Sequence, residues 1–127
     1  MPDCIFCKIV GGEIPSTKTY ENERVIVIDD IHPVARVHSL IITKRHYQDI
    51  LSLAVGPPAG AGAPDGPPAG ADVMADVLDA VRETAALKGV SASGFRLISN
   101  CGADGGQMIA HLHFHIIGGQ SLGPKVV

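Results

Sequence analysis

Three histidines near the C-terminal end of the chain have the residue type and spacing that catalysis or metal binding requires. Residues 111–117, HLHFHII, alternate histidine with apolar residues, so a β-strand would present three imidazoles on one face: His111, His113 and His115. At ~3.3 Å rise per residue, neighbouring rings start ~6.6 Å apart and the outer two ~13 Å apart. Zinc holds nitrogen ligands at ~2.1 Å, so two neighbouring rings could share one ion, but three on a straight strand could not without strain. We therefore expect the three histidines to have separate roles.

A glycine-rich turn leads directly into this histidine segment. Residues 100–107, NCGADGGQ, carry three glycines between two expected strands. Glycine lets backbone N–H groups surround an anion, as in phosphate-binding nests, although a glycine-rich hairpin loop is more often only a turn. Imidazole can attack phosphorus and form a covalent phosphoryl or nucleotidyl intermediate that water then resolves. The turn and the histidines together predict a phosphate cradle beside a nucleophile or acid–base group.

Apolar runs and helical patterns must position these residues. Four runs with β-branched or alternating apolar residues predict strands, at residues 24–29, 37–42, 95–99 and 110–117. The strongest helix is expected over 72–88, with Asp72 as its N-cap and Gly89 just beyond its end. Two weaker helices are expected, at residues 44–53 and 5–10. This order predicts an α+β fold with a mainly antiparallel sheet and packed helices.

The length and composition indicate a single domain over residues 1–127. Hydrophobic residues make up 46% of the 127 residues, which is enough for a core. Residues 56–71 consist of five Gly, five Pro, five Ala and one Asp, and this tract has little to bury or to bind. A lid or recognition segment is the alternative, but a disordered low-complexity insertion is favoured, and loop closure makes such an insertion inexpensive.

Charge and cysteine usage exclude several classes of protein. The net charge is −3, and the ten basic residues form no run, which disfavours a nucleic-acid partner. No apolar stretch approaches the ~20 residues that span a bilayer, so no membrane partner is expected. The first eight residues lack the pattern of a secretory signal, and three cysteines do not make a disulfide framework. A reducing, cytoplasmic location is expected.

Motifs along nearly the whole chain resemble the histidine triad (HIT) superfamily, and within it the small nucleotide-binding phosphoramidase branch of the bacterial, zinc-containing type. The histidine segment HLHFHII matches the signature of that family. The other matching stretches are CIFCKIVGGEIP at 4–15, DIHP at 30–33, TKRH at 43–46 and NCGADGGQ at 100–107. The tract at 56–71 and the last few residues are not covered.

The resemblance implies roles for particular residues. His113 would be the nucleophile that attacks the α-phosphorus of a nucleotide, and His115 would contact the phosphate and support the developing charge. Asn100, Gly106 and Gln107 would position the phosphate oxygens. The ribose would bind Asp30, and five apolar residues would either sandwich the purine or simply belong to the core: Ile5, Phe6, Ile9, Ile28 and Ile31.

The resemblance also implies a structural zinc site with four ligands. Cys4 and Cys7 have the C-x₂-C spacing of zinc ligands, which by itself is a weak signal. His46 and His111 match the two histidines that complete a tetrahedral site in bacterial-type members. A set of four soft or borderline ligands suits structural Zn²⁺ and leaves no open position. The alternative is a pair of reduced cysteines with no metal.

The function implied is an enzyme acting at the α-phosphate of purine nucleotides, most specifically an adenosine 5′-monophosphoramidase. The alternatives are dinucleoside polyphosphate hydrolysis and a nucleotide-binding interaction module with incidental catalysis. The resemblance further implies a homodimer whose two sheets join into one. Met108 stands where the phosphoramidases usually have serine, and its thioether is a poor substitute for a hydroxyl. Cys101 is interpreted as a turn residue, and His32 and His38 as structural or solvent-facing.

Overall fold

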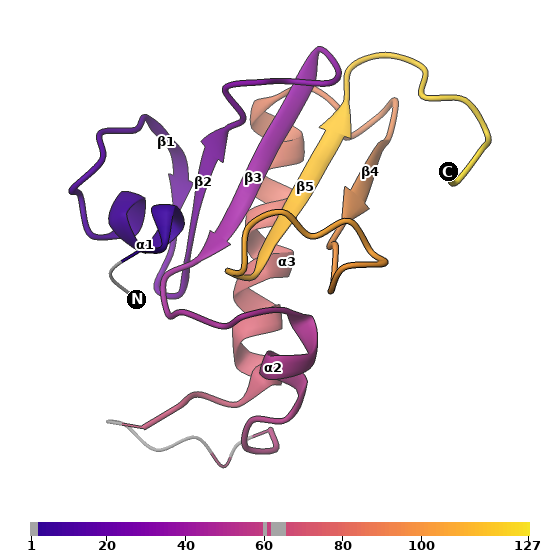
Figure 1. Ribbon diagram of the computed structural model, residues 1–127. Helices are drawn as coiled ribbons and strands as arrows, with labels where there is room; N and C mark the ends of the chain where they lie inside the picture. Colours follow the sequence, from indigo (N-terminus) through magenta and orange to yellow (C-terminus); the bar gives the residue numbers. More distant parts are fainter. Residues whose placement is uncertain (1–2, 60, 62–65) are drawn as a thin grey trace.

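The computed structural model describes residues 3–59, 61 and 66–127, so the expected disorder of the tract falls partly on residues that lie outside this description. Its centre is a five-stranded sheet with the order β1-β2-β3-β5-β4 (Figure 1). Every neighbouring pair is antiparallel. The strands are β1 (Lys18–Glu21), β2 (Val25–Asp29), β3 (Val37–Thr43), β4 (Phe95–Ile98) and β5 (His113–Gly118). The expected α+β class is confirmed.

Both faces of this sheet are covered, each by a different helix. Along β2, Val25 and Val27 face the helix α3 (Gly70–Leu87), whereas Ile26 and Ile28 face α1 (Ile5–Val10). Figure 1 shows α3 running behind the strands and α1 beside β1 and β2 at the other face. Because side chains alternate between faces, a strand buried on both sides is apolar throughout. The continuous apolar runs of β2 and β3 therefore follow from this two-sided cover.

The helix α3 begins earlier than expected. Asp72 lies in its first turn, and the N-cap is Ala69, which has no side-chain capping bond. Ala69 is fully buried, and a Cβ added to Gly70 would lie 2.8 Å from the backbone oxygen of Leu53. Packing against the preceding helix α2 (Ile50–Ala54) therefore starts α3 inside the Gly/Pro/Ala tract. At the other end the expected stop is confirmed, because Gly89 follows the C-cap with a φ of 72°.

Three other elements differ from the sequence prediction. The strand β1 was not expected, and β5 begins only at His113 rather than at residue 110. The helix expected over 44–53 shrinks to α2, since residues 44–48 are held by distant partners. Tyr47 O accepts from the Leu112 N–H at 2.7 Å, and Gln48 O accepts from the Gln107 amide at 2.7 Å. These tertiary hydrogen bonds replace the helical ones that the local sequence favours.

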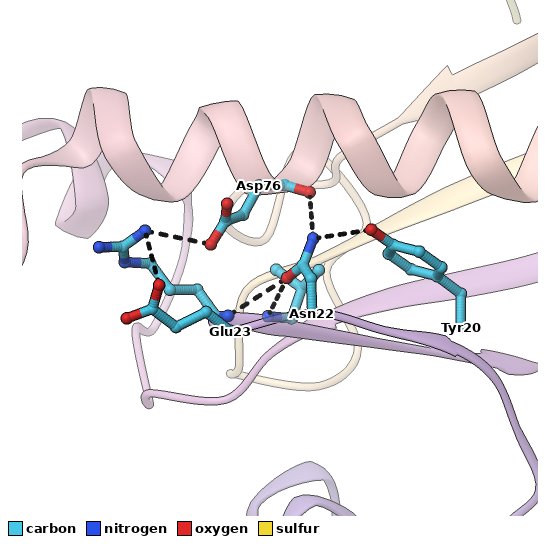
Figure 2. Close-up of polar contacts among 6 residues, drawn as sticks. Tyr20, Asn22, Glu23 and Asp76 are labelled. Atoms are coloured by element: carbon cyan, nitrogen blue, oxygen red, sulfur yellow. Dashed lines mark hydrogen bonds and ion pairs between the residues drawn. The ribbon is translucent and has the colours of Figure 1, made fainter.

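The hairpin between β1 and β2 is fixed to α3 by two side chains (Figure 2). Asn22 donates to the Asp76 backbone oxygen at 3.0 Å, and its own side-chain oxygen accepts from the backbone N–H groups of Arg24 and Val25. Arg24 also pairs with the Asp76 carboxylate at 3.1 Å. These bonds set how α3 crosses the sheet.

Within the described part of the chain, no helix combines the length and apolar character that crossing a bilayer requires.

The packing at the start of α3 predicts which part of the tract the fold needs. Replacing residues 59–66 with a short Gly/Ser linker should leave the unfolding free energy nearly unchanged. Gly70→Ala should lower it by about 1–3 kcal/mol, because the new methyl group overlaps the Leu53 carbonyl. Urea unfolding followed by circular dichroism measures both. A linker variant as unstable as Gly70→Ala would show that the middle of the tract also supports the fold.

Candidate active site and metal-binding group

Two groups of polar side chains lie around the start of β5, on or beside its α1 face. The pairing of β3 with β5 sets Ile42 opposite His113 and Leu40 opposite His115. Leu40 and Ile42 pack into the core under α1, so both histidines share that side of the sheet. His111 lies just before the strand and is fully buried. The three histidines therefore have different surroundings, and the expectation that all three lie on one strand face is wrong for His111, which precedes the strand.

The hydrogen bonding of His113 leaves one ring nitrogen free to react. Its Nδ1 lies 2.7 Å from the backbone oxygen of His111. A carbonyl can only accept, so Nδ1 carries the proton and Nε2 keeps its lone pair in the neutral ring. The Phe6 ring packs edge-on against this imidazole at a centroid distance of 4.9 Å. A backbone contact and an aromatic contact thus orient a neutral imidazole with a nucleophilic Nε2.

The opposite tautomer follows for His115 from its contact with His38. The Val34 N–H donates to His38 Nδ1 at 3.1 Å, so a neutral His38 carries its proton on Nε2. That Nε2 lies 2.9 Å from Nδ1 of His115 and 3.3 Å from Oδ2 of Asp30. His115 Nδ1 therefore accepts, and its proton is on Nε2. Where His113 offers a lone pair, His115 offers an N–H donor.

Burial favours the neutral form of the His113 and His115 rings by lowering the pKa of each. It lowers the pKa of His113, although the His111 carbonyl and Asp30 partly oppose the shift. Burial also lowers the pKa of His115 to about 4, and the nearby rings of His113 and His38 lower it further. An imidazole must be unprotonated to attack phosphorus, so the site is ready for nucleophilic chemistry at neutral pH.

The glycine-rich turn is tightly built and adjoins His113. Ser99, directly after β4, donates to the His113 backbone oxygen at 3.3 Å, which brings the start of the turn beside β5. Asn100 then donates to Gly105 O at 2.7 Å. A Cβ at Gly105 would overlap the Cys101 backbone oxygen, so only glycine fits there. Gly106 takes a φ of 73°.

The side chain of Gln107 holds this turn in place. Its Oε1 accepts from the Gly102 N–H at 3.0 Å, and its Nε2 donates to Gln48 O at 2.7 Å and to Ile109 O at 3.0 Å. Both amide protons are thus used within the protein. Gln107 would therefore act on a bound phosphate by holding the shape of the turn, and not by donating its own side-chain N–H groups to the phosphate.

The five apolar residues expected at a purine pocket divide into two groups. Phe6, Ile9 and Ile28 are buried in the core between α1 and the sheet. Ile5 is 46% exposed and Ile31 is 85% exposed. Asp30 directly precedes Ile31, and its Oδ1 accepts from the His32 N–H at 2.8 Å. In this structure only Ile5 and Ile31 offer substantial apolar surface to a ligand.

The second group gathers all four residues expected to bind metal. Their ligand atoms lie within 4.8 Å of one another: Cys4, Cys7, His46 and His111. His111 Nδ1 is 3.2 Å from Cys4 Sγ, 3.5 Å from Cys7 Sγ and 3.1 Å from His46 Nδ1, and Cys7 Sγ is 3.3 Å from His46 Nδ1. A tetrahedral zinc ion would space such atoms ~3.3–3.8 Å apart. The donor set and its spacing therefore fit Zn²⁺ after a slight expansion.

The tautomer of His111 also suits a metal ligand. Its Nε2 lies 2.7 Å from the Thr43 backbone oxygen, so Nε2–H donates and Nδ1 keeps a lone pair that points at the cysteines. Carbonyl partners commonly fix metal-binding histidines in this way. Cys4 and His46 also line an open groove of about 430 Å³, whose other lining residues are Asp3, Ile5, Gln48, Met108, Ile109 and Ala110. Met108 is 95% exposed there.

The sequence interpretation missed two residues of these groups. His38 was taken as structural or solvent-facing, yet it is buried against His115 and Asp30. The sequence did contain a signal for His38. It lies an even number of residues before Leu40 and Ile42, so it points to the same face of the strand. Thr43, which binds the ring of His111, gave no comparable signal. Its role depends on where residues 43 and 111 meet in space.

Comparisons with known proteins identify the family. The family model described as HIT domain matches residues 11–122. A histidine triad protein from Clostridium difficile aligns with a TM-score of 0.83 at 40% identity, covering 98% of this chain and 97% of that chain. A HIT family hydrolase from Clostridium thermocellum aligns with a TM-score of 0.82 at 39% identity, covering 100% and 99%. The chain belongs to the HIT domain family.

One curated relative carries a named activity. The adenylylsulfatase HINT3 of Arabidopsis thaliana is 36% identical over 115 residues, which are 91% of this chain and 51% of that protein. Similarity to this protein and to the clostridial hydrolase supports a hydrolase role in general terms.

The surroundings of His115 predict a pH dependence of stability. Its pKa of about 4 in the folded state lies below the ordinary ~6.5 of an unfolded chain, so the unfolded state binds more protons between these values. The unfolding free energy should therefore fall as the pH drops from about 6.5 to 4. His115→Gln should make this slope shallower, while His32→Asn, at an exposed histidine, serves as control. Equal slopes in the wild type and His115→Gln would contradict the prediction. Urea titrations at several pH values give the slopes.

Proposed function

We propose that this protein hydrolyses purine nucleotides at the α-phosphate through a nucleotidyl intermediate on His113. The observation that carries the proposal is the opposed pair of tautomers. His113 presents an unprotonated Nε2 because its Nδ1–H binds the His111 carbonyl. His115 presents an Nε2–H because its Nδ1 accepts from His38. A nucleophile and a hydrogen-bond donor on the same strand face are what phosphoryl substitution requires.

The proposed reaction has two steps. His113 Nε2 attacks the α-phosphorus, a P–N bond forms, and the bond to the leaving group breaks with its electron pair going to that group. An amine leaving group takes up a proton from water. His115 donates its Nε2–H to a phosphate oxygen on which charge develops. Water then attacks the phosphorus and releases a proton to the solvent, which balances the proton that the amine took up. The P–Nε2 bond breaks with its electron pair returning to Nε2, and AMP and neutral His113 are released.

The remaining site residues are proposed to hold the nucleotide. Asn100, Gly106 and Gln107 shape the turn around the phosphate, with Gln107 acting through its hold on the loop. Asp30 binds the ribose, and apolar residues hold the purine: Ile5, Phe6, Ile9, Ile28 and Ile31. Of these, Phe6, Ile9 and Ile28 are largely core residues here, so their contribution would be to the floor of the pocket.

The preferred substrate is proposed to be an adenosine 5′-monophosphoramidate. Two other substrates share the AMP group and differ only in what leaves. Adenylyl sulfate is included because the relative HINT3 is an adenylylsulfatase. Diadenosine polyphosphate represents the alternative enzyme class. Met108 offers no hydroxyl to a phosphate or leaving group, so we expect slow turnover relative to members that have serine there.

The covalent intermediate provides the decisive test. Mixing excess enzyme with each of the three substrates and quenching in alkali should trap one AMP on His113, detected by peptide mass spectrometry. His113→Asn should lower turnover by roughly 10³-fold or more, as removal of a nucleophile does. His32→Asn is the matched control at an exposed histidine. A wild-type protein that binds AMP but forms no adduct would instead be a binding module.

Zinc is proposed to occupy the group of Cys4, Cys7, His46 and His111 in a structural role. When bound, it would hold α1 and the end of β3 to the segment before β5.

Two copies are proposed to form a homodimer through β4, the edge strand that pairs only with β5 in the described sheet. Leu97 on this strand is half exposed. A cytoplasmic location is proposed because all three cysteines are free thiols, as in a reducing compartment.

Metal analysis checks the zinc proposal. Protein purified without chelator should contain one zinc per chain by elemental mass spectrometry. Cys4→Ser and His46→Asn should each lose most of the zinc, because each removes one of four ligands. Cys101→Ser, which changes the one cysteine outside the group, should keep it. A metal-free wild type would leave the reduced-cysteine alternative.

A further inference from the structure

His111 belongs to both groups of the site at once. Its ring nitrogen Nδ1 lies among the metal-binding atoms, 3.2 Å from Cys4 Sγ and 3.1 Å from His46 Nδ1. Its backbone oxygen lies 2.7 Å from Nδ1 of His113 and fixes the tautomer of that ring. One residue therefore joins the ligand cluster to the nucleophile without any intervening side chain.

The ladder of the sheet does not reach that backbone oxygen, and its peptide group is held instead by the Leu112 N–H, which donates to Tyr47 O at 2.7 Å. The ladder between β3 and β5 ends with Ile42 opposite His113, so His111 lies outside it. The ring of His111 is held on one side by the Thr43 oxygen at 2.7 Å and on the other by the ligand cluster. Because the residue is fully buried, its ring cannot shift without moving the backbone next to it. The ligand cluster therefore helps to aim the carbonyl at His113.

A second connection runs through α1. Cys4 caps this helix and Cys7 lies in its first turn, so both thiols belong to the element that carries Phe6. The Phe6 ring contacts His113 at a centroid distance of 4.9 Å and His111 at 5.8 Å. A helix of six residues is too short to be stable alone, so its position depends on what tethers it. The ligand cluster is one of those tethers.

We propose that the group of Cys4, Cys7, His46 and His111 positions the nucleophile His113, in addition to stabilising the fold. Closing the group around a metal ion holds the His111 carbonyl and the Phe6 ring against His113, and so keeps Nδ1 protonated and Nε2 unprotonated. With the group open, the carbonyl and the ring are less constrained, and His113 populates both tautomers. This inference rests on the proposed function only for its effect on rate, because the tautomer of His113 is observable without substrate.

The first experiment compares zinc-loaded and chelated protein at one pH. Cys4 and His46 line an open groove of about 430 Å³, so a small chelator has access to the group. Nitrogen-15 NMR of the histidine rings should show one His113 tautomer with zinc and a mixture without it. The rate of AMP–His113 formation at saturating substrate should fall at least tenfold, since small misplacements of reacting groups cost up to about 10² in rate. The Kd for AMP should change less than threefold.

The second experiment keeps zinc bound and changes the aromatic contact. Phe6→Leu should retain one zinc per chain, broaden the His113 tautomer distribution and slow adduct formation at saturating substrate. Val10→Ala, on the same helix and half-buried but outside both groups, is the matched control and should leave both readouts unchanged. This comparison decides the question even where chelation unfolds the protein.

The outcomes separate this inference from the proposed function. The positioning role would be overturned if the His113 tautomer and the rate of adduct formation were unchanged in both the chelated protein and Phe6→Leu. The group would then only stabilise the fold. Absence of an adduct in every form, with a zinc-dependent tautomer of His113, would overturn the proposed function and support the positioning role.

Discussion

The antiparallel pairing of β3 with β5 is the constraint on which the rest of the structure depends. It sets Leu40 opposite His115 and Ile42 opposite His113, which turns both histidines toward α1. The same pairing brings His38 next to His115. A shift of one residue would turn the histidines toward α3 and would move Phe114 and Ile116, which are now buried there, to the α1 face. The apolar core therefore enforces the register that the chemistry uses.

Backbone groups then give chemically equal rings different roles. A carbonyl at His111 makes His113 an acceptor at Nε2, and the Val34 N–H acting through His38 makes His115 a donor. The Thr43 carbonyl leaves Nδ1 of His111 free for a metal. The three side chains are chemically identical, and they differ in which ring nitrogen carries the proton because each ring has a different hydrogen-bond partner.

The Gly/Pro/Ala tract looked at first like an insertion independent of the fold. Its last residues are in fact part of α3, where Ala69 is fully buried and Gly70 packs tightly beside Leu53. Low-complexity composition says little about such contacts, because small residues are also the ones that allow close approach of backbones. The boundary between tract and helix was therefore set by packing rather than by the Asp72 capping signal.

The sequence alone determined the fold class and the shared face of His113 and His115, and its resemblance to a known family pointed to the four residues that gather as a candidate metal-binding group. The first two follow from apolar patterning and strand alternation, which are local properties, whereas the ligand set came from the motifs of the family. The roles of His38 and Thr43, the short α2 and the inward use of the Gln107 amide were decided only by the tertiary structure. Each depends on hydrogen bonds between segments far apart in the chain, and the distance along a sequence does not reveal which segments meet.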